Sequence, residues 1–212
     1  MIDTLQHKGQ RKRLVELLQK KGISDEKVLM ALNTVPRHLF MSHLPHFAYE
    51  DKAYPIGAEQ TISQPFTVAF QTQLLEIKKG EKILEIGTGS GYQSAVLIEM
   101  GAKVYTIERV LELYTKTQAL LPKIGYNPQF FYGDGYLGKP TYGPFDKILI
   151  TAGAPSVPEE LLKQLKIGGI LVAPIGLGDC QIMTKITKVD ETNFQKQEFG
   201  DFAFVPMIKG VK

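Results

Sequence analysis

A short apolar segment that runs into a glycine-rich turn constrains the fold of this chain more than any other feature. Residues 82–86 have the composition of a buried strand, and the run Gly87-Thr-Gly-Ser-Gly91 follows directly. A helical stretch with apolar Ala95, Val96 and Ile98 comes next. The glycines permit a tight turn and a close approach of a ligand to the backbone. This segment therefore predicts a strand, a tight turn and a helix, the first half of a βαβ unit.

The alternation of strands and helices continues beyond this unit. Further strands are expected at 103–108, 129–132, 145–151 and 169–174, and helices at 110–121 and 158–165. Strand-like runs around 180–189 and 201–208 close the chain. This order predicts an α/β fold with a mostly parallel, doubly wound sheet. Ligands of such sheets bind beyond the carboxyl ends of the strands.

The first third of the sequence is predicted to be helical. Apolar residues at 14, 15, 17 and 18 form a helical stripe that stops at Gly22. Ser24 is the expected N-cap of a second helix, whose apolar face continues to Pro36. Residues 45–65 contain several prolines and show no clean period, and long irregular segments are often functional. We expect residues 1–79 to form a helical cap and residues 80–212 the sheet domain, packed as one globular unit.

Composition excludes several classes of protein. With 43% hydrophobic and 22% charged residues the 212-residue chain is too apolar to be disordered. It contains no apolar run of the roughly 18–20 residues that a membrane helix needs, and no secretory signal, so we expect a soluble cytoplasmic protein without membrane partners.

Cys180 is the single cysteine, which excludes an intrachain disulfide and argues against a cysteine-built zinc site. Residues 1–21 carry six basic and two acidic side chains of a chain whose net charge is +3, so the remainder is close to neutral. We interpret this basic helix as a solvated face and expect no nucleic-acid partner.

Acidic residues follow the next two predicted strands. Glu108 ends the second strand, 17 residues after Gly91, where a carboxylate can accept hydrogen bonds from a ribose diol. Asp134 follows the third strand and could accept a hydrogen bond from an adenine amino group. Tyr92 stands where a dinucleotide fingerprint would have its third glycine. The pattern instead resembles Rossmann-like methyltransferases that use S-adenosyl-L-methionine. The cofactor-binding residues predicted in this part of the chain are Glu85, Gly87, Thr88, Gly89, Ser90, Gly91, Glu108, Arg109, Asp134 and Gly135.

The acceptor is indicated by two loops. Methyltransferases that act on exocyclic amines commonly carry an Asn/Asp-Pro-Pro-Tyr/Phe loop after the fourth strand, whereas this chain has Thr151-Ala-Gly-Ala-Pro155. Upstream of the glycine run lies Gln60-Thr-Ile-Ser-Gln-Pro65. This motif resembles the signature of protein-L-isoaspartate (D-aspartate) O-methyltransferases, and the similarity extends over nearly the whole chain. It includes Val35-Pro-Arg-His-Leu-Phe40, Tyr49-Glu-Asp51, Gly133-Asp-Gly135 and Phe204-Val-Pro-Met207.

The resemblance implies a repair enzyme. Its substrates would be damaged proteins and peptides, methylated on the free α-carboxylate of L-isoaspartyl and D-aspartyl residues. It implies a Rossmann-like fold whose final strands are rearranged relative to the common methyltransferase order. It places Ser63 at the catalytic centre, Gln60, Thr61, Ile62 and Ser63 at the cofactor, and Ser63, Gln64, Val205 and Pro206 at the substrate. One departure is Glu59, where the family usually has glycine. This side chain could alter the backbone angles of the loop or the peptide preference.

The expected chemistry needs little from side chains. An α-carboxylate has a pKa of roughly 3.3–3.7 and is ionised at neutral pH, so no general base is required. His38, His43 and His46 do not have the spacing of common zinc sites, and we predict no metal. Two alternatives stay open at this point. One is a methyltransferase for a small carboxylate or hydroxyl acceptor, and the other is a protein that binds S-adenosylmethionine without catalysis. The sequence does not give the oligomeric state, and we expect a monomer.

Overall fold

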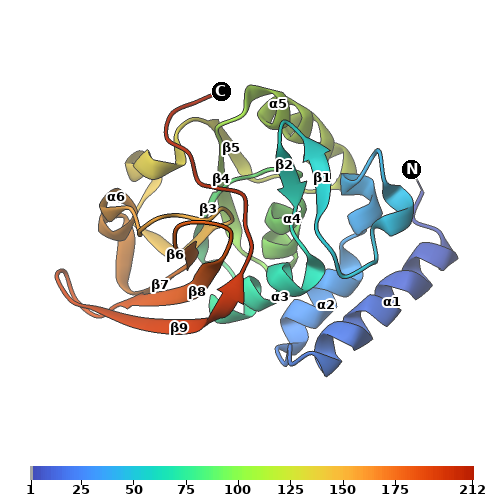
Figure 1. Ribbon diagram of the computed structural model, residues 1–212, viewed down its shortest axis with the longest axis horizontal. Helices are drawn as coiled ribbons and strands as arrows, with labels where there is room; N and C mark the ends of the chain where they lie inside the picture. The colour runs from blue at the N-terminus through green and yellow to red at the C-terminus, as the bar shows by residue number, and fades with distance from the viewer. Residues whose placement is uncertain (1) are drawn as a thin grey trace.

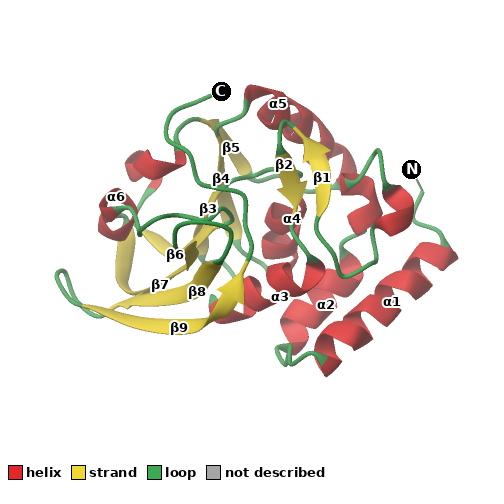
Figure 2. Cartoon of the chain, viewed as in Figure 1, coloured by secondary structure: helices red, strands yellow, loops and turns green. Residues whose placement is uncertain are grey.

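A seven-stranded sheet with helices on both faces forms the body of the molecule (Figures 1 and 2). The computed structural model describes residues 2–212. The strand order is β5-β4-β3-β6-β7-β8-β9. The strands are β3 (Lys82–Ile86), β4 (Lys103–Glu108), β5 (Gln129–Tyr132), β6 (Phe145–Ile150), β7 (Leu165–Ile175), β8 (Gln181–Lys188) and β9 (Phe194–Phe202). Strands β3 to β7 are parallel, and β8 and β9 pair antiparallel at one edge. The predicted Rossmann-like α/β class is confirmed.

The chain reverses its direction of travel across the sheet after β5. From β3 it steps outward through α4 (Tyr92–Glu99) to β4 and through α5 (Leu111–Leu120) to β5. It then returns to β6, on the other side of β3, and continues through α6 (Glu159–Lys163) to β7. Because parallel crossovers are right-handed, the two directions of travel put their helices on opposite faces. The carboxyl ends of β3 and β6 therefore lie at the switch point where ligands bind in such sheets.

Two hydrophobic clusters cover the two faces of the sheet, as the alternation of side chains along each strand requires. Ile83 packs in one cluster and its neighbour Leu84 in the other. The first cluster joins the sheet to α4, α5 and the N-terminal helices α1 (Leu5–Lys20), α2 (Glu26–Thr34) and α3 (Pro65–Leu74). The second lies between the sheet and α6. Residues 2–79 and the sheet thus share a continuous apolar core.

The N-terminal region differs from the expectation in two places. Asp25, not Ser24, caps α2: its Oδ1 accepts hydrogen bonds from the backbone N–H of Lys27 at 2.8 Å and of Val28 at 3.3 Å. The basic face of α1 is also not wholly solvated. Arg11 is 5% exposed and its guanidinium forms hydrogen bonds with both carboxylate oxygens of Asp3 at 3.1 and 3.0 Å.

Three other expectations need correction. Residues 45–65 hold an antiparallel hairpin, β1 (Tyr54–Gly57) and β2 (Gln60–Ile62), which the mixed polar pattern concealed. The helix expected at 158–165 ends at Lys163, because β7 begins at Leu165. The last strand is β9 (Phe194–Phe202) rather than 201–208. Its residues are mostly exposed, since β9 is an edge strand, and so they lack the apolar alternation that marks a strand.

Among residues 2–212, no helix combines the length and the apolar character needed to cross a membrane.

Candidate active site

A cavity of about 820 Å³, open to solvent, lies at the carboxyl ends of the strands. Four segments that are distant in sequence line it: residues 60–63, which are β2 and the residue after it, 86–90 at the end of β3, 107–109 at the end of β4, and 205–208 near the C-terminus. The remaining lining residues include Tyr92, Gln93, Gly135, Thr151 and Ala152. The structure therefore brings the predicted glycine loop and the predicted Thr-Ile-Ser loop to one cavity.

The glycine loop is held close to its neighbours. Gly87 and Gly91 have φ of +97° and +83°, in the left-handed region that favours glycine. A Cβ on Gly87 would lie 2.6 Å from Oγ1 of Thr151, whose hydroxyl is 2.8 Å from the carbonyls of both Ile86 and Gly87. A Cβ on Gly91 would lie 2.7 Å from Cγ2 of Thr117. Gly87, Thr88, Gly89 and Ser90 line the cavity, whereas Gly91 lies behind it.

Glu108 ties this loop to the end of β4. One carboxylate oxygen accepts the backbone N–H of Gly89 at 2.8 Å and the other accepts that of Val110 at 2.9 Å. The side chain is 4% exposed and lines the cavity beside Arg109. Each oxygen keeps acceptor capacity beyond its backbone partner. The carboxylate is thus fixed in the cavity wall with acceptor capacity for a ligand, and its contact with a ribose diol stays a prediction.

Two of the predicted acidic residues lie outside the cavity lining. Glu85 is fully buried in β3, where it accepts a hydrogen bond from the Ser94 hydroxyl. Burial raises the pKa of Glu85 to about 7, although the Ser94 hydrogen bond acts in the opposite direction. Asp134 accepts the backbone N–H of Tyr136 at 2.9 Å and that of Gly210 at 2.7 Å. It therefore fastens the C-terminal tail beside the cavity, while the adjacent Gly135 lines it.

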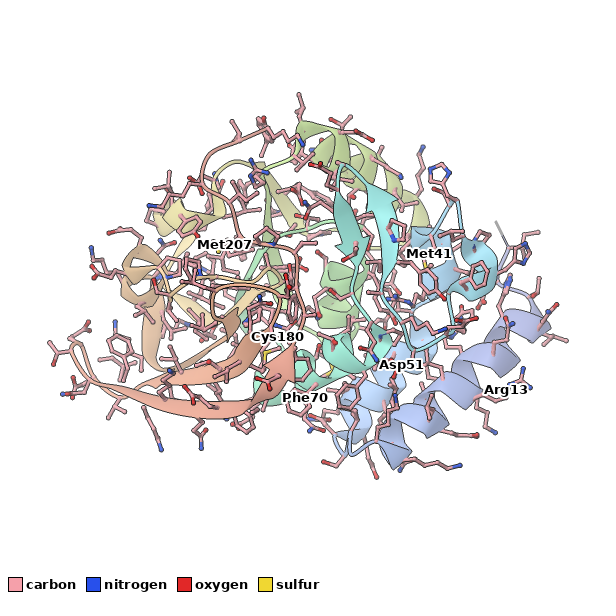
Figure 3. The ribbon with its side chains drawn as sticks, viewed as in Figure 1. Arg13, Met41, Asp51, Phe70, Cys180 and Met207 are labelled. Atoms are coloured by element: carbon pink, nitrogen blue, oxygen red, sulfur yellow. The ribbon has the colours of Figure 1, made fainter. Side chains whose placement is uncertain are left out.

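Ser63 lies between β2 and α3, in a segment held from two sides. Oδ1 of Asp51 accepts the backbone N–H of Phe66 in the first turn of α3 at 2.8 Å, and the Gln64 side chain donates to the Asp51 carbonyl at 3.0 Å. Figure 3 shows Asp51 beside the start of α3. From the other side, Nη2 of Arg37 donates to the Ser63 carbonyl at 2.8 Å. Ser63 is thereby fixed in the cavity wall.

The hairpin turn that precedes Ser63 has an unusual backbone. Ala58 and Glu59 have φ of +51° and +60°, and two positive φ values in succession are typical of a type I′ turn. Glycine or asparagine usually fills such positions. The Glu59 carboxylate lies 3.1 Å from Nζ of Lys212, so this side chain meets the C-terminal residue at the surface.

A second groove of about 880 Å³ adjoins the cavity at Ser63. Both spaces are lined by Thr61, Ser63, Thr151 and Val205. Gln64 lines the groove but not the cavity. Val205 is held here by its carbonyl, which accepts the N–H of Gly153 at 2.8 Å, and Met207 donates back to the Gly153 carbonyl at 2.7 Å. Figure 3 shows Met207 on the C-terminal segment that passes over the strand ends. Pro206 lines the cavity beside it.

His38 clusters with His7 and Asp3, and not with His43 and His46, which are nearer to it in the sequence. His38 is buried and stacks on His7, with ring centroids 3.8 Å apart and planes inclined by 28°. Asp3 completes the cluster, the candidate metal group in residues 2–212. Its carboxylate already carries the bidentate hydrogen bonds of Arg11. Nearly parallel rings also cannot both direct an in-plane nitrogen lone pair at one ion. The absence of a metal site stays a prediction.

Comparisons with known proteins assign the chain to a family. A family model described as protein-L-isoaspartate (D-aspartate) O-methyltransferase matches residues 9–212. Relatives from Christiangramia forsetii and Flavobacterium psychrophilum, both named protein-L-isoaspartate O-methyltransferase, are 59% and 58% identical over 211 residues, which is 99% of this chain and 99% of each relative. The chain belongs to this family.

Solved structures of protein-L-isoaspartate O-methyltransferases share the fold. One superposes with a TM-score of 0.83 at 31% identity and covers 92% of this chain, which in turn spans 65% of that longer protein. Another, from Plasmodium falciparum and in complex with S-adenosyl-L-homocysteine, gives a TM-score of 0.81 at 28% identity, covering 94% of this chain and 99% of that one.

The cavity of this protein-L-isoaspartate O-methyltransferase also contains residues that the sequence does not predict to contact a ligand. Tyr92, Gln93, Thr151, Met207 and Ile208 line the cavity, and Arg37 holds Ser63 from behind. Thr151 and Met207 lie in motifs that carry the family resemblance, but their types and spacing do not indicate a role. Arg37 follows Pro36 in a short 3₁₀ turn, and nothing in the local pattern indicates that its guanidinium is buried.

Proposed function

We propose that this S-adenosylmethionine-dependent methyltransferase repairs damaged proteins by methylating the free α-carboxylate of L-isoaspartyl and D-aspartyl residues. The observation that carries the proposal is the meeting of two spaces at Ser63. The cavity beside the glycine loop suits a small cofactor, and the adjoining groove suits a peptide. One chain lines both spaces, which supports a monomer as the working unit.

The residues of the cavity fit S-adenosyl-L-methionine. The backbone of Gly87–Ser90 lines the cavity and would face the amino-acid part of the cofactor, and Glu108 would offer acceptors to its ribose. Ile86 and Ile107 supply apolar wall, and Arg109, Gly135 and the segment Gln60–Ser63 complete the enclosure. We retain Glu85, Gly91 and Asp134 as residues that shape this site from behind. The bound cofactor would supply an electrophilic methyl group on a sulfonium.

The side chains then have to align an acceptor that is already ionised. The Ser63 hydroxyl is proposed to donate a hydrogen bond to one carboxylate oxygen and to leave the other free to attack. Gln64, Val205 and Pro206 would hold the peptide on either side. No proton has to be removed from the acceptor, so the site needs no general base. Alignment of this kind can supply up to about 7–11 kcal/mol of the barrier.

A transfer assay with matched peptides tests the proposed function. The protein is incubated with methyl-labelled S-adenosylmethionine and with two peptides that differ only in an isoaspartyl or an aspartyl linkage. We expect base-labile methyl ester on the isoaspartyl peptide alone. Equal labelling of both peptides, or labelling of neither, would contradict the proposal. Cofactor binding without any transfer would instead support the non-catalytic alternative.

Replacing Ser63 by alanine tests the role of its hydroxyl. A hydrogen bond to a charged group contributes about 1.5–3 kcal/mol, so S63A should lower kcat/KM for an isoaspartyl peptide roughly 10- to 150-fold. The matched control is Ser24→Ala, an exposed serine at the start of α2 that should leave kcat/KM unchanged. Wild-type kcat/KM in S63A would refute the assignment.

The protein is proposed to work in the cytoplasm. Cys180 is a free, exposed thiol, which fits a reducing environment.

A further inference from the structure

Arg37 is a buried cation that forms no salt bridge with any of residues 2–212. Its side chain is fully buried, and its guanidinium lies 4.7 Å from the centre of the Tyr92 ring. Nη2 donates to the Ser63 carbonyl, whereas Nε and Nη1 find no hydrogen-bond partner among residues 2–212. Burial lowers the pKa of Arg37 to about 10, so the group is still charged at neutral pH.

Such an arrangement is costly and calls for a compensating interaction. Burying a charge without a partner costs several kcal/mol. Arg11, the other buried arginine of the described chain, shows the usual solution, because its guanidinium pairs with the Asp3 carboxylate and also donates to the Tyr49 hydroxyl. No carboxylate among residues 2–212 forms a salt bridge with Arg37. The Asp51 carboxylate favours the charged form of Arg37 through space, which raises the Arg37 pKa, but its oxygens are occupied by Lys21 and by the N–H of Phe66.

Both contacts of Arg37 point toward the active cavity. Ser63 and Tyr92, the residues that the guanidinium touches, each line that cavity. The positive charge, which no salt bridge within residues 2–212 neutralises, therefore lies next to the wall where the acceptor carboxylate is proposed to bind. Because Arg37 is fully buried, water screens its charge less than it would screen a charge at the surface.

We propose that Arg37 is a positioning residue that fixes Ser63 through its carbonyl and favours an anionic acceptor at the Ser63 hydroxyl. This inference rests on the proposed function and adds a source of specificity to it. A carboxylate would be selected over a neutral amide or alcohol, without a direct salt bridge that would hold the nucleophile too tightly.

The charge should act on substrate binding more than on the transfer step. During transfer the carboxylate oxygen forms a bond to the methyl carbon, the carbon–sulfur bond breaks, and its electron pair stays on sulfur. The acceptor thereby becomes a neutral ester. A positive charge behind Ser63 favours the anionic substrate over this product, so removing it should raise KM more than it lowers kcat.

Three variants separate charge from hydrogen bonding. Arg37→Gln keeps an N–H donor and removes the charge, so it should raise KM for an isoaspartyl peptide about tenfold with a smaller change in kcat. Arg37→Lys keeps the charge and should return KM to within about threefold of wild type. Arg11→Met, the control, removes a buried arginine that does not contact Ser63, and it should lower Tm without changing KM. In all three, the Kd for S-adenosylhomocysteine should stay within about threefold of wild type.

The wild-type protein supplies a test that does not depend on the variants folding. In one peptide the acceptor carboxylate is replaced by a neutral carboxamide. The inhibition constant of this amide peptide should be at least tenfold higher than the Kd of the corresponding acid peptide. Equal binding of acid and amide, wild-type KM in folded R37Q, or an equal rise of KM in R37Q and R11M would each overturn the proposal. Failure of the wild type to methylate any isoaspartyl peptide would refute the proposed function instead.

Discussion

Glu85 and Glu108 show how environment divides the work of two carboxyl groups. Both end or approach the end of a central strand, and both are buried. Glu108 accepts two backbone N–H groups and lines the cavity. Glu85 accepts the Ser94 hydroxyl, while its second oxygen has no hydrogen-bond partner among the described residues. The structure thus places Glu108 where it can hold a ligand and Glu85 where it responds to pH.

Ionisation of Glu85 should reduce stability as pH rises. Burial raises its pKa from 4.5 to about 7, so the folded protein binds this proton more tightly than the unfolded chain does. The resulting stabilisation is complete below about pH 4.5 and is lost as pH rises through 7, by about 3 kcal/mol at pH 8. The free energy of unfolding of Glu85→Gln relative to wild type should therefore increase from pH 4.5 to pH 8. Glu16→Gln, at an exposed position of α1, is the control and should give a flat difference in urea titrations.

A flat pH profile for the Glu85→Gln difference would contradict this account of the buried carboxyl. Comparison with wild type at each pH cancels the contributions of the other titrating groups, His38 included.

At the scale of elements, the turn between β3 and α4 sets the site. Gly91 is the N-cap of α4 in the left-handed region, and it packs against Thr117 and Leu121 at the end of α5. The Thr117 hydroxyl also donates to the Gly89 carbonyl at 2.7 Å. The loop that would cradle the cofactor is therefore supported by a helix from the following βαβ unit.

Gly91→Ala should be far more damaging than a glycine substitution with a similar backbone angle in open space. Its Cβ would lie 2.7 Å from Thr117 Cγ2 and 3.0 Å from Leu121 Cδ1. Gly125 has φ of +91°, and a Cβ added there would meet no atom within 4 Å, so Gly125→Ala isolates the backbone cost of about 1 kcal/mol. We expect Gly91→Ala to lower the free energy of unfolding by about 1–3 kcal/mol more than Gly125→Ala does, because overpacking adds to the backbone strain. Equal urea midpoints for the two variants would show that the loop does not depend on close packing.

The elements that could be predicted are those whose side chains are buried in a regular pattern. Strands β3 and β4 match their predicted bounds, because parallel strands inside a sheet are largely apolar runs. β5 also matches, although it is a partly exposed edge strand, since its aromatic residues are of the types enriched in strands. The edge strand β9 and the hairpin β1–β2 carry mixed, exposed residues and were missed or misplaced. In the site, the glycine loop follows from local turn chemistry. The burial of Arg37 and the attachment of Asp134 to Gly210 depend on contacts between distant segments, which spacing along the chain does not reveal.

At the scale of the whole molecule, the helical cap and the sheet domain that the sequence predicts are joined by one hydrophobic core. Residues on both sides of the boundary at 79 and 80 belong to a single hydrophobic cluster. The Gln71 side chain in α3 donates to the Ile150 carbonyl at the end of β6 at 3.0 Å, in a buried position. Contacts of this kind couple the segment that carries Ser63 to the sheet that carries the glycine loop.

This shared core predicts a single cooperative unfolding transition. Calorimetric and van't Hoff enthalpies should agree, and saturating S-adenosylhomocysteine should move the whole transition to higher temperature. Two transitions, of which only one moves with the ligand, would show that the cap and the sheet unfold independently.

The most direct test of the central claim is a structure of the protein with S-adenosylhomocysteine and an isoaspartyl peptide. The account predicts the cofactor sulfur beside Gly87–Gly89, its ribose hydroxyls at Glu108, and a peptide carboxylate oxygen within hydrogen-bond distance of the Ser63 hydroxyl. A peptide carboxylate bound away from Ser63, or a cofactor outside the cavity lined by the glycine loop, would contradict it.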